Sequence, residues 1–268
     1  MERLRVLWRL RGIPAMGRVD GWWRTQSAGF RWLLPAWLLV IISLPIVGWT
    51  LGEDAMRRAV SLGVALQAGL MLAVLVGALG WRRALPLAGG VAALGWAAEA
   101  LGSKTGVPFG AYHYTDALQP QVAGVPLVIP FAWLMMLPPA WAVAARIGGH
   151  WRDMRFVVLS ALAMTAWDLF LDPQMVGLGL WEWAQPGGYF GIPWVNFGGW
   201  LLVSALITAL LRPPPLPAAP LLTVYGLTLA LEAIGLGIFW RQPGPALVGT
   251  LAMGALLALA LRQPGDLA

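Results

Sequence analysis

Acidic side chains occur at four positions within stretches of sequence that are otherwise almost entirely apolar: Glu99, Asp168, Asp172 and Glu232. Asp172 follows Asp168 by four residues, so a helix would present both carboxyl groups on one face. Ionisable groups are costly inside a bilayer and usually mark function there. Two acids held together in a site of low dielectric do not both ionise readily, which leaves a neutral acid beside a carboxylate. We therefore expect Asp168, Asp172 and Glu99 to be catalytic.

Aromatic and hydrogen-bonding residues gather near these acids, mainly in the loops that follow them. The faces of indole and phenol rings attract cations, so this composition suits a reaction that passes through a positively charged intermediate. The alternative for any one tryptophan is an anchor at the membrane interface. Trp200 is a further candidate for lining the site. The residues expected to bind substrate are Tyr112, His113, Tyr114, Trp133, Trp167, Trp181, Trp183, Tyr189, Trp194, Asn196 and Glu232.

Three of the polar features also have simpler interpretations. Glu232 has no aromatic loop beside it and is equally consistent with a structural hydrogen bond between helices. Asp172 precedes a proline, and Asp172-Pro173 is also consistent with a turn that ends a helix. Lys104, the only lysine in the chain, is a partner for Glu99 or Asp116, or else a solvated loop charge.

The composition is that of a membrane protein. Of 268 residues, 59% are hydrophobic and 11% charged, and the mean hydropathy is +0.71. The chain has no cysteine, which excludes disulfides and thiolate chemistry. Its two histidines, His113 and His150, are far apart, which disfavours a histidine metal site or a b-type haem. We expect no metal, no cofactor and no nucleic-acid partner, since the net charge of +6 does not belong to a basic soluble domain.

Long apolar segments predict an all-α fold, a polytopic integral membrane helical bundle with about eight transmembrane helices. About 20 residues cross the hydrocarbon core, so the shorter segments are marginal and seven spans is the alternative. We expect one transmembrane domain over residues 31–268, preceded at 1–30 by a basic segment that is an interfacial helix or a disordered tail. The apolar segments are 32–51, 59–80, 85–101, 126–147, 156–171, 196–211, 219–240 and 245–261.

Loop charge predicts the orientation of these segments. With a cytoplasmic N-terminus, only Arg57, Arg58, Lys104 and Arg241 lie outside, and the other fourteen of the 18 basic residues lie inside. This distribution obeys the positive-inside rule. We therefore expect a multi-pass protein of the cell membrane with a cytoplasmic N-terminus and with both aromatic loops on the outer side. Helix rise then places Glu99, Asp168 and Glu232 at a similar depth, about 20 Å from the inner ends.

At the two loops the sequence resembles the carotenoid biosynthesis membrane-protein family that includes carotenoid 1′,2′-hydratases. The resemblance is close over about residues 95–200, and the spaced motifs are more specific together than singly. Its motifs here are Glu99, Thr105-Gly, Pro108-Phe-Gly-Ala-Tyr112-His-Tyr114, Gly124-Val-Pro126, Trp133-Leu-Met-Met136, Asp168-Leu-Phe-Leu-Asp172-Pro, Trp181-Glu-Trp183, Tyr189-Phe-Gly-Ile-Pro193 and Asn196-Phe-Gly-Gly-Trp200.

The resemblance implies a cofactor-independent hydro-lyase that adds water to the terminal C1′=C2′ bond of an acyclic carotenoid end, of the lycopene or γ-carotene type. The expected partners are a carotenoid substrate, water and membrane lipid, with other carotenoid-pathway enzymes as candidates. A related cyclase or isomerase would use the same protonation and is the first alternative. A proton-coupled transporter also places acids within helices, but the inner halves of these helices are almost entirely apolar.

Overall fold

The computed structural model describes residues 21–148 and 153–263, so most of the predicted basic segment lies outside the described residues. Eight long helices, α2 to α9, account for most of the described chain. Each covers one of the eight predicted apolar segments. Their bounds are α2 Ala28–Leu51, α3 Glu53–Leu79, α4 Trp81–Thr105, α5 Ile129–Arg146, α6 Met154–Gly177, α7 Trp194–Leu211, α8 Ala218–Ile234 with its π-helical continuation η1 Gly235–Phe239, and α9 Pro243–Arg262.

Seven of these helices are long and apolar enough to cross a membrane. The eighth, α5, has 18 residues and contains Pro138 and Pro139. It is buried along nearly its whole length, so its surroundings are other helices rather than lipid. The chain is therefore an all-α, multi-pass membrane bundle, and the alternatives of seven and eight spans differ only in how α5 is counted.

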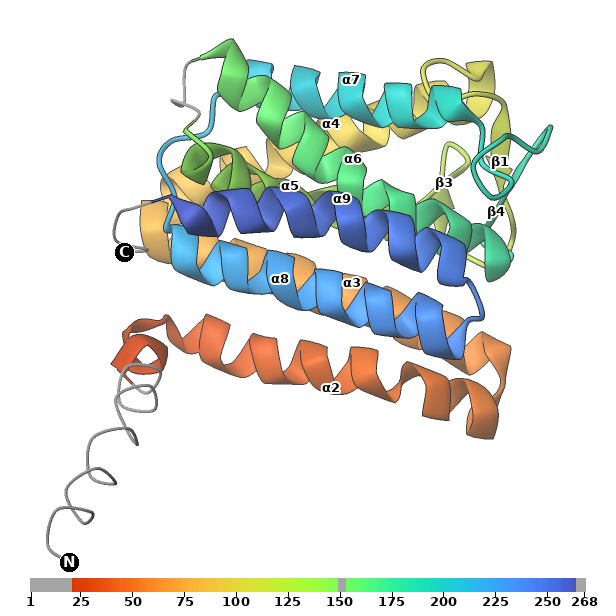
Figure 1. Ribbon diagram of the computed structural model, residues 1–268, viewed down its shortest axis with the longest axis horizontal. Helices are drawn as coiled ribbons and strands as arrows, with labels where there is room; N and C mark the ends of the chain where they lie inside the picture. Colours follow the sequence, from red (N-terminus) through yellow and green to blue (C-terminus); the bar gives the residue numbers. More distant parts are fainter. Residues whose placement is uncertain (1–20, 149–152, 264–268) are drawn as a thin grey trace, which may run out of the picture.

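The helices run alternately in opposite directions along the bundle (Figure 1). The start of α2 and the end of α9 lie at one end, and the short strands lie at the opposite end. Strand β1, Tyr112–Tyr114, pairs antiparallel with β4, Trp181–Trp183. The two aromatic loops predicted to share one side of the membrane thus form one small sheet. Strands β2, Gln121–Val122, and β3, Val125–Pro126, form a second short pair.

Basic side chains are distributed unequally between the two ends of the bundle. The strand end carries Arg57, Arg58, Lys104 and Arg241, whereas twice as many of the described basic residues lie at the opposite end. Those residues are Arg24, Arg31, Arg82, Arg83, Arg146, Arg155, Arg212 and Arg262. By the positive-inside rule this asymmetry predicts that the strands face away from the cytoplasm.

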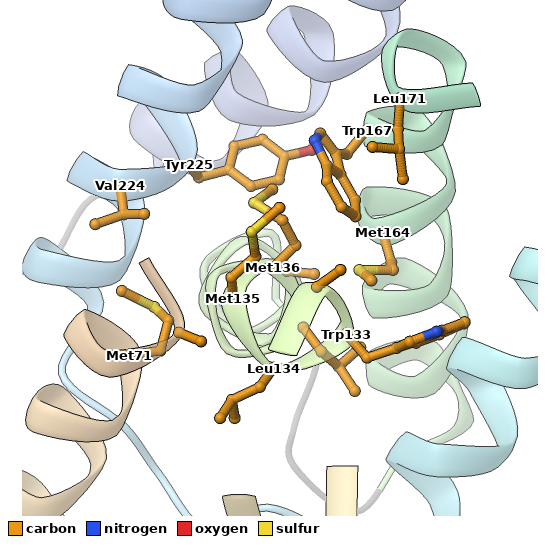
Figure 2. Close-up of a cluster of buried hydrophobic side chains, with 14 of the residues drawn as sticks. Met71, Trp133, Leu134, Met135, Met136, Met164, Trp167, Leu171, Val224 and Tyr225 are labelled. Atoms are coloured by element: carbon orange, nitrogen blue, oxygen red, sulfur yellow. The ribbon is translucent and has the colours of Figure 1, made fainter. Parts of the chain in front are cut away.

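Helix α5 forms the centre of the core. Figure 2 looks along this helix, and consecutive residues of Trp133-Leu-Met-Met136 point in different directions toward its neighbours. Met71 of α3, Met164 and Trp167 of α6, and Tyr225 of α8 surround it. On the side of α4, a Cβ at Gly95 would collide with the Trp133 ring. That glycine therefore allows the indole to lie against the α4 backbone, close to Glu99 one turn later.

Helix α6 continues through Asp168, Asp172 and Pro173 to Gly177, so both aspartates lie on one helix and Asp172-Pro173 is not a turn that ends it. A proline inside a helix has no amide N–H for the carbonyl four residues earlier, here that of Leu169. The Tyr189 hydroxyl donates to this carbonyl oxygen at 2.9 Å and replaces the missing donor. Pro139 in α5 leaves the Met135 carbonyl without its helical donor in the same way. Buried Gln67 supplies the replacement, since its Nε2 donates to the Met135 carbonyl oxygen at 3.5 Å. Both compensating donors are distant in sequence.

Candidate active site

A cavity of about 120 Å³ lies inside the bundle near the strand end. Its walls combine three acidic residues with aromatic side chains and long apolar stretches of α2 and α3. We call it the catalytic cavity, because Glu99 and Asp172, two of the three acids expected to be catalytic, line it. Of the residues predicted to form a site, those that line it are Glu99, Tyr112, Tyr114, Trp133, Trp167, Asp172, Trp181, Trp183, Asn196 and Glu232, together with Trp200.

Glu99 of α4 accepts three hydrogen bonds from two other elements. The hydroxyls of Tyr112 and Tyr114, both on β1, donate to Oε2, the latter at 2.9 Å. The indole Nε1 of Trp133 on α5 donates to Oε1 at 3.2 Å. The residue is 5% exposed. Three donors directed at one carboxyl group favour its ionised form and offset part of the cost of burying it.

Asp168 and Asp172 of α6 share one amide group from α7. Asn196 Nδ2 donates to Oδ2 of both residues, at 2.8 Å for Asp168. Trp181 Nε1 of β4 donates to the other oxygen of Asp172 at 2.7 Å. Asp172 lines the cavity, but Asp168 does not; it is fully buried, and its Oδ1 has no hydrogen-bond partner in the described part of the chain. Asp168 therefore lies behind Asp172 and is linked to it through the Asn196 amide.

The strand register explains which loop residues reach the cavity. Tyr112 is opposite Trp183 and Tyr114 is opposite Trp181, and all four line the cavity. Side chains alternate along a strand, so the intervening pair, His113 and Glu182, points away. The His113 side chain is 66% exposed and lies 3.8 Å from Glu182. The structure therefore does not bring His113 to the cavity, contrary to the sequence prediction.

Tyr189 and Trp194 also lie away from the cavity. Trp194 is 65% exposed and packs against Tyr189 and Phe197 in a separate cluster. Tyr189 is buried there, with its hydroxyl used by the Leu169 carbonyl. The sequence suggests Tyr189 and Trp194 as site residues because they follow Trp181 and Trp183 in the same loop. Their contacts, however, pack the loop against α6 and α7 outside the cavity.

Three tryptophans form the aromatic wall. Trp133 and Trp200 stack with ring centroids 4.4 Å apart and planes 9° from parallel. Trp167 meets Trp200 edge-on at 6.0 Å. All three line the catalytic cavity. Such faces stabilise a positive charge held near them in a site with little water.

Residues 59–256 match the family described as carotenoid biosynthesis protein. The chain belongs to this family. It is similar to a bisanhydrobacterioruberin hydratase of Haloarcula japonica, with 34% identity over 115 residues, which are 42% of this chain and 39% of that protein. No solved structure matches the chain.

The phenol groups of Tyr112 and Tyr114 act as hydrogen-bond donors to Glu99. Burial, followed by the nearby Glu99 charge, raises the pKa of Tyr112 and of Tyr114 well above the ordinary value for tyrosine. Both side chains therefore stay protonated at any physiological pH. Lys104, by contrast, is exposed and has no ion pair among the described residues, so the solvated interpretation holds.

Polar residues that the sequence prediction omitted complete the cavity on the side of α3 and α8. Gln67 is 3% exposed and donates to Thr228 Oγ1 at 3.2 Å. Gln67 could have been noticed as the one amide in the apolar segment 59–80. Glu232, which was predicted, lines the cavity on the same side, near the Trp167 indole, whose N–H has no hydrogen-bond partner of ordinary geometry among the described residues. Within the described residues, no group of three or more His, Cys, Asp and Glu side chains is arranged to hold a metal ion.

Proposed function

We propose that this protein is a carotenoid hydratase, which adds water across the terminal C1′=C2′ double bond of an acyclic carotenoid end. The observation that carries the proposal is the position of Asp172 and Glu99 on one cavity, with stacked tryptophans beside them. Family membership and the similarity to a carotenoid hydratase support the same chemistry. A catalyst for alkene hydration needs an acid, a base and a surface that tolerates a cation, and each is present.

The first step is protonation of the alkene by Asp172. The neutral carboxylic acid delivers its proton to C2′, and the π-electron pair forms the new C–H bond, which leaves a tertiary cation at C1′. Two carboxyl groups against one amide do not both carry charge easily, so the pair Asp168–Asp172 retains a proton for this step. The faces of Trp133 and Trp200 stabilise the cation.

The second step is capture of the cation by water. The oxygen of the water molecule bonds to C1′ while Glu99 takes a proton from that water, which gives a tertiary alcohol. Asp172 has then lost a proton and Glu99 has gained one. Water in the shared cavity carries this proton from Glu99 back to Asp172. The net reaction consumes one water molecule, and its atoms balance with neither an oxidant nor a cofactor. Asp168 and Asn196 are positioning residues for Asp172.

The membrane placement follows the charge asymmetry. With the arginine-rich end on the cytoplasmic side of the cell membrane, the cavity lies close to the outer interface. A long polyene dissolved in the bilayer reaches this depth with one end, and water is available there. Other enzymes that supply or consume the carotenoid in the same membrane are the expected partners.

The test is expression in a host that accumulates lycopene, followed by mass analysis of the pigments. A product heavier by one water is expected with the wild-type protein. Asp172→Asn and Glu99→Gln should abolish it, while Asp116→Asn, an exposed acid at the same end of the bundle, should not. Membrane levels of each variant are measured in parallel. Unchanged lycopene with the wild type would contradict the proposal, and a cyclised product of unchanged mass would indicate a cyclase instead.

A further inference from the structure

A second pocket, of about 760 Å³, lies at the opposite end of the bundle from the strands. Its walls come from the start of α2, the end of α3 and the start of α8. We call it the inner pocket. Its lining residues are Trp22, Thr25, Gln26, Ser27, Phe30, Ala73, Val74, Gly77, Ala78, Pro217, Ala219 and Pro220.

The inner pocket and the catalytic cavity involve the same three helices. The catalytic cavity is lined on α2 from Trp37 to Leu44, on α3 from Val60 to Gln67 and on α8 from Thr228 to Glu232. Along α2 and its N-terminal edge, Leu44 and Ser27 are seventeen residues apart, and so are Ser61 and Ala78 on α3. A helix covers this interval in about 25 Å.

That span matches the ligand of the proposed function. An extended C40 polyene is comparable in length to the hydrocarbon core, which is about 30 Å. We propose that the inner pocket binds the distal end of the carotenoid, whose reacting end lies in the catalytic cavity and whose chain follows α2, α3 and α8. This inference rests on the proposed function for its ligand. It adds a binding subsite that selects substrates by length.

The inner pocket is not wholly apolar. Thr25, Gln26 and Ser27 contribute polar groups, and the buried Nε1 of Trp22 has no hydrogen-bond partner within residues 21–148 and 153–263. A buried N–H without a partner is unfavourable and gains free energy when a ligand supplies an acceptor. The hydroxyl group of a carotenoid end that has already gained water is such an acceptor. A singly hydrated molecule can therefore bind in the reverse direction and present its second end to Asp172.

The test measures lycopene binding to the purified full-length protein in detergent. Quenching of tryptophan emission reports the binding. It uses the Asp172→Asn background, in which the ligand is not consumed, so the result is independent of whether hydration occurs. Gly77→Phe fills the inner pocket, since of the described atoms a Cβ there meets only Ser27 Cβ, at 3.8 Å. Gly89→Phe is the matched control, because a Cβ at Gly89 has none of the described atoms within 4 Å.

Gly77→Phe is expected to raise the Kd for lycopene about tenfold or more, and Gly89→Phe to leave it unchanged. An unchanged Kd in Gly77→Phe would overturn the inference. So would loss of co-purifying phospholipid from Gly77→Phe without a change in lycopene affinity, because a lipid would then be the occupant. Trp22→Phe should weaken binding of singly hydrated lycopene about tenfold and leave lycopene unaffected. An equal effect on both ligands, or on neither, would overturn the hydroxyl contact.

Discussion

The hydroxyl of Tyr189 donates to the carbonyl oxygen of Leu169 at 2.9 Å, in the place of the amide N–H that Pro173 lacks. Without this donor a buried carbonyl of α6 would be unpaired, next to the turn that carries both aspartates. The contact links the loop after β4 to the backbone of α6. It also explains why a proline directly after an acid does not end this helix.

Replacement of Tyr189 should therefore affect stability more than chemistry. Tyr189→Phe leaves the Leu169 carbonyl unpaired and is expected to lower the free energy of unfolding by about 1–3 kcal/mol. The rate of hydration per folded molecule should stay within about threefold of wild type, since the ring does not touch the cavity. Thermal unfolding in detergent and a pigment assay measure the two effects. A large rate loss with unchanged stability would contradict this structural role.

Removal of the Asn196 amide should disable the aspartate pair. Asn196→Leu withdraws the donor shared by Asp168 and Asp172, and we expect a rate loss of about 100-fold or more as the acid loses its position. Ser204→Ala is a suitable control on the same helix, because Ser204 is buried and none of the residues that the structure describes forms a hydrogen bond with its hydroxyl. Full activity in Asn196→Leu would show that the pair does not act as a unit.

The stacked tryptophans should contribute to rate through their faces. Trp200→Leu removes the ring that stacks on Trp133, and a loss of about 2 kcal/mol of cation stabilisation corresponds to roughly 30-fold in rate. Trp200→Phe should lose less, since an aromatic face remains. Trp194→Leu changes an exposed tryptophan outside the cavity and should have little effect. Equal losses for Trp200→Leu and Trp194→Leu would remove the cation argument.

Alkaline pH should destabilise the fold through Tyr112. Its pKa is raised in the folded state by burial and by Glu99, whereas in the unfolded chain it is about 10. The folded state therefore binds more protons above that pH. The free energy of unfolding should be constant with respect to this group below about pH 9 and fall as the pH rises beyond about 10. Melting temperatures from pH 7 to 11 should fall less steeply for Tyr112→Phe. Identical slopes in the two proteins would contradict the shift.

Most of the fold could be predicted from hydropathy and charge. The eight apolar segments correspond to α2–α9 because a membrane span needs a long apolar run, and such runs are unmistakable. Helix ends were less predictable. α4 continues to Thr105 and α6 to Gly177, since tertiary hydrogen bonds such as that of Tyr189 support turns that local sequence disfavours.

The site was predictable in its acids and only partly in its aromatic residues. Glu99 and Asp172 were identified because charged groups are rare in membrane helices. His113 and Trp194 were indistinguishable in sequence from their neighbours, since strand register and loop packing decide which side chains face inward. Thr228 of α8 and the cavity-lining residues of α2, Trp37, Ile41 and Leu44, could not be predicted, because helix packing brings them to the cavity and short-range patterns do not contain it.

Hydration by purified protein in water labelled with heavy oxygen tests the central claim most directly. Lycopene in detergent is incubated with the wild type and with Asp172→Asn, and the products are analysed by mass spectrometry with fragmentation. We predict one labelled oxygen at the terminal tertiary carbon with the wild type and none with Asp172→Asn. Two results would contradict the account: wild-type protein that leaves lycopene unhydrated, or wild type and Asp172→Asn that form equal amounts of labelled product.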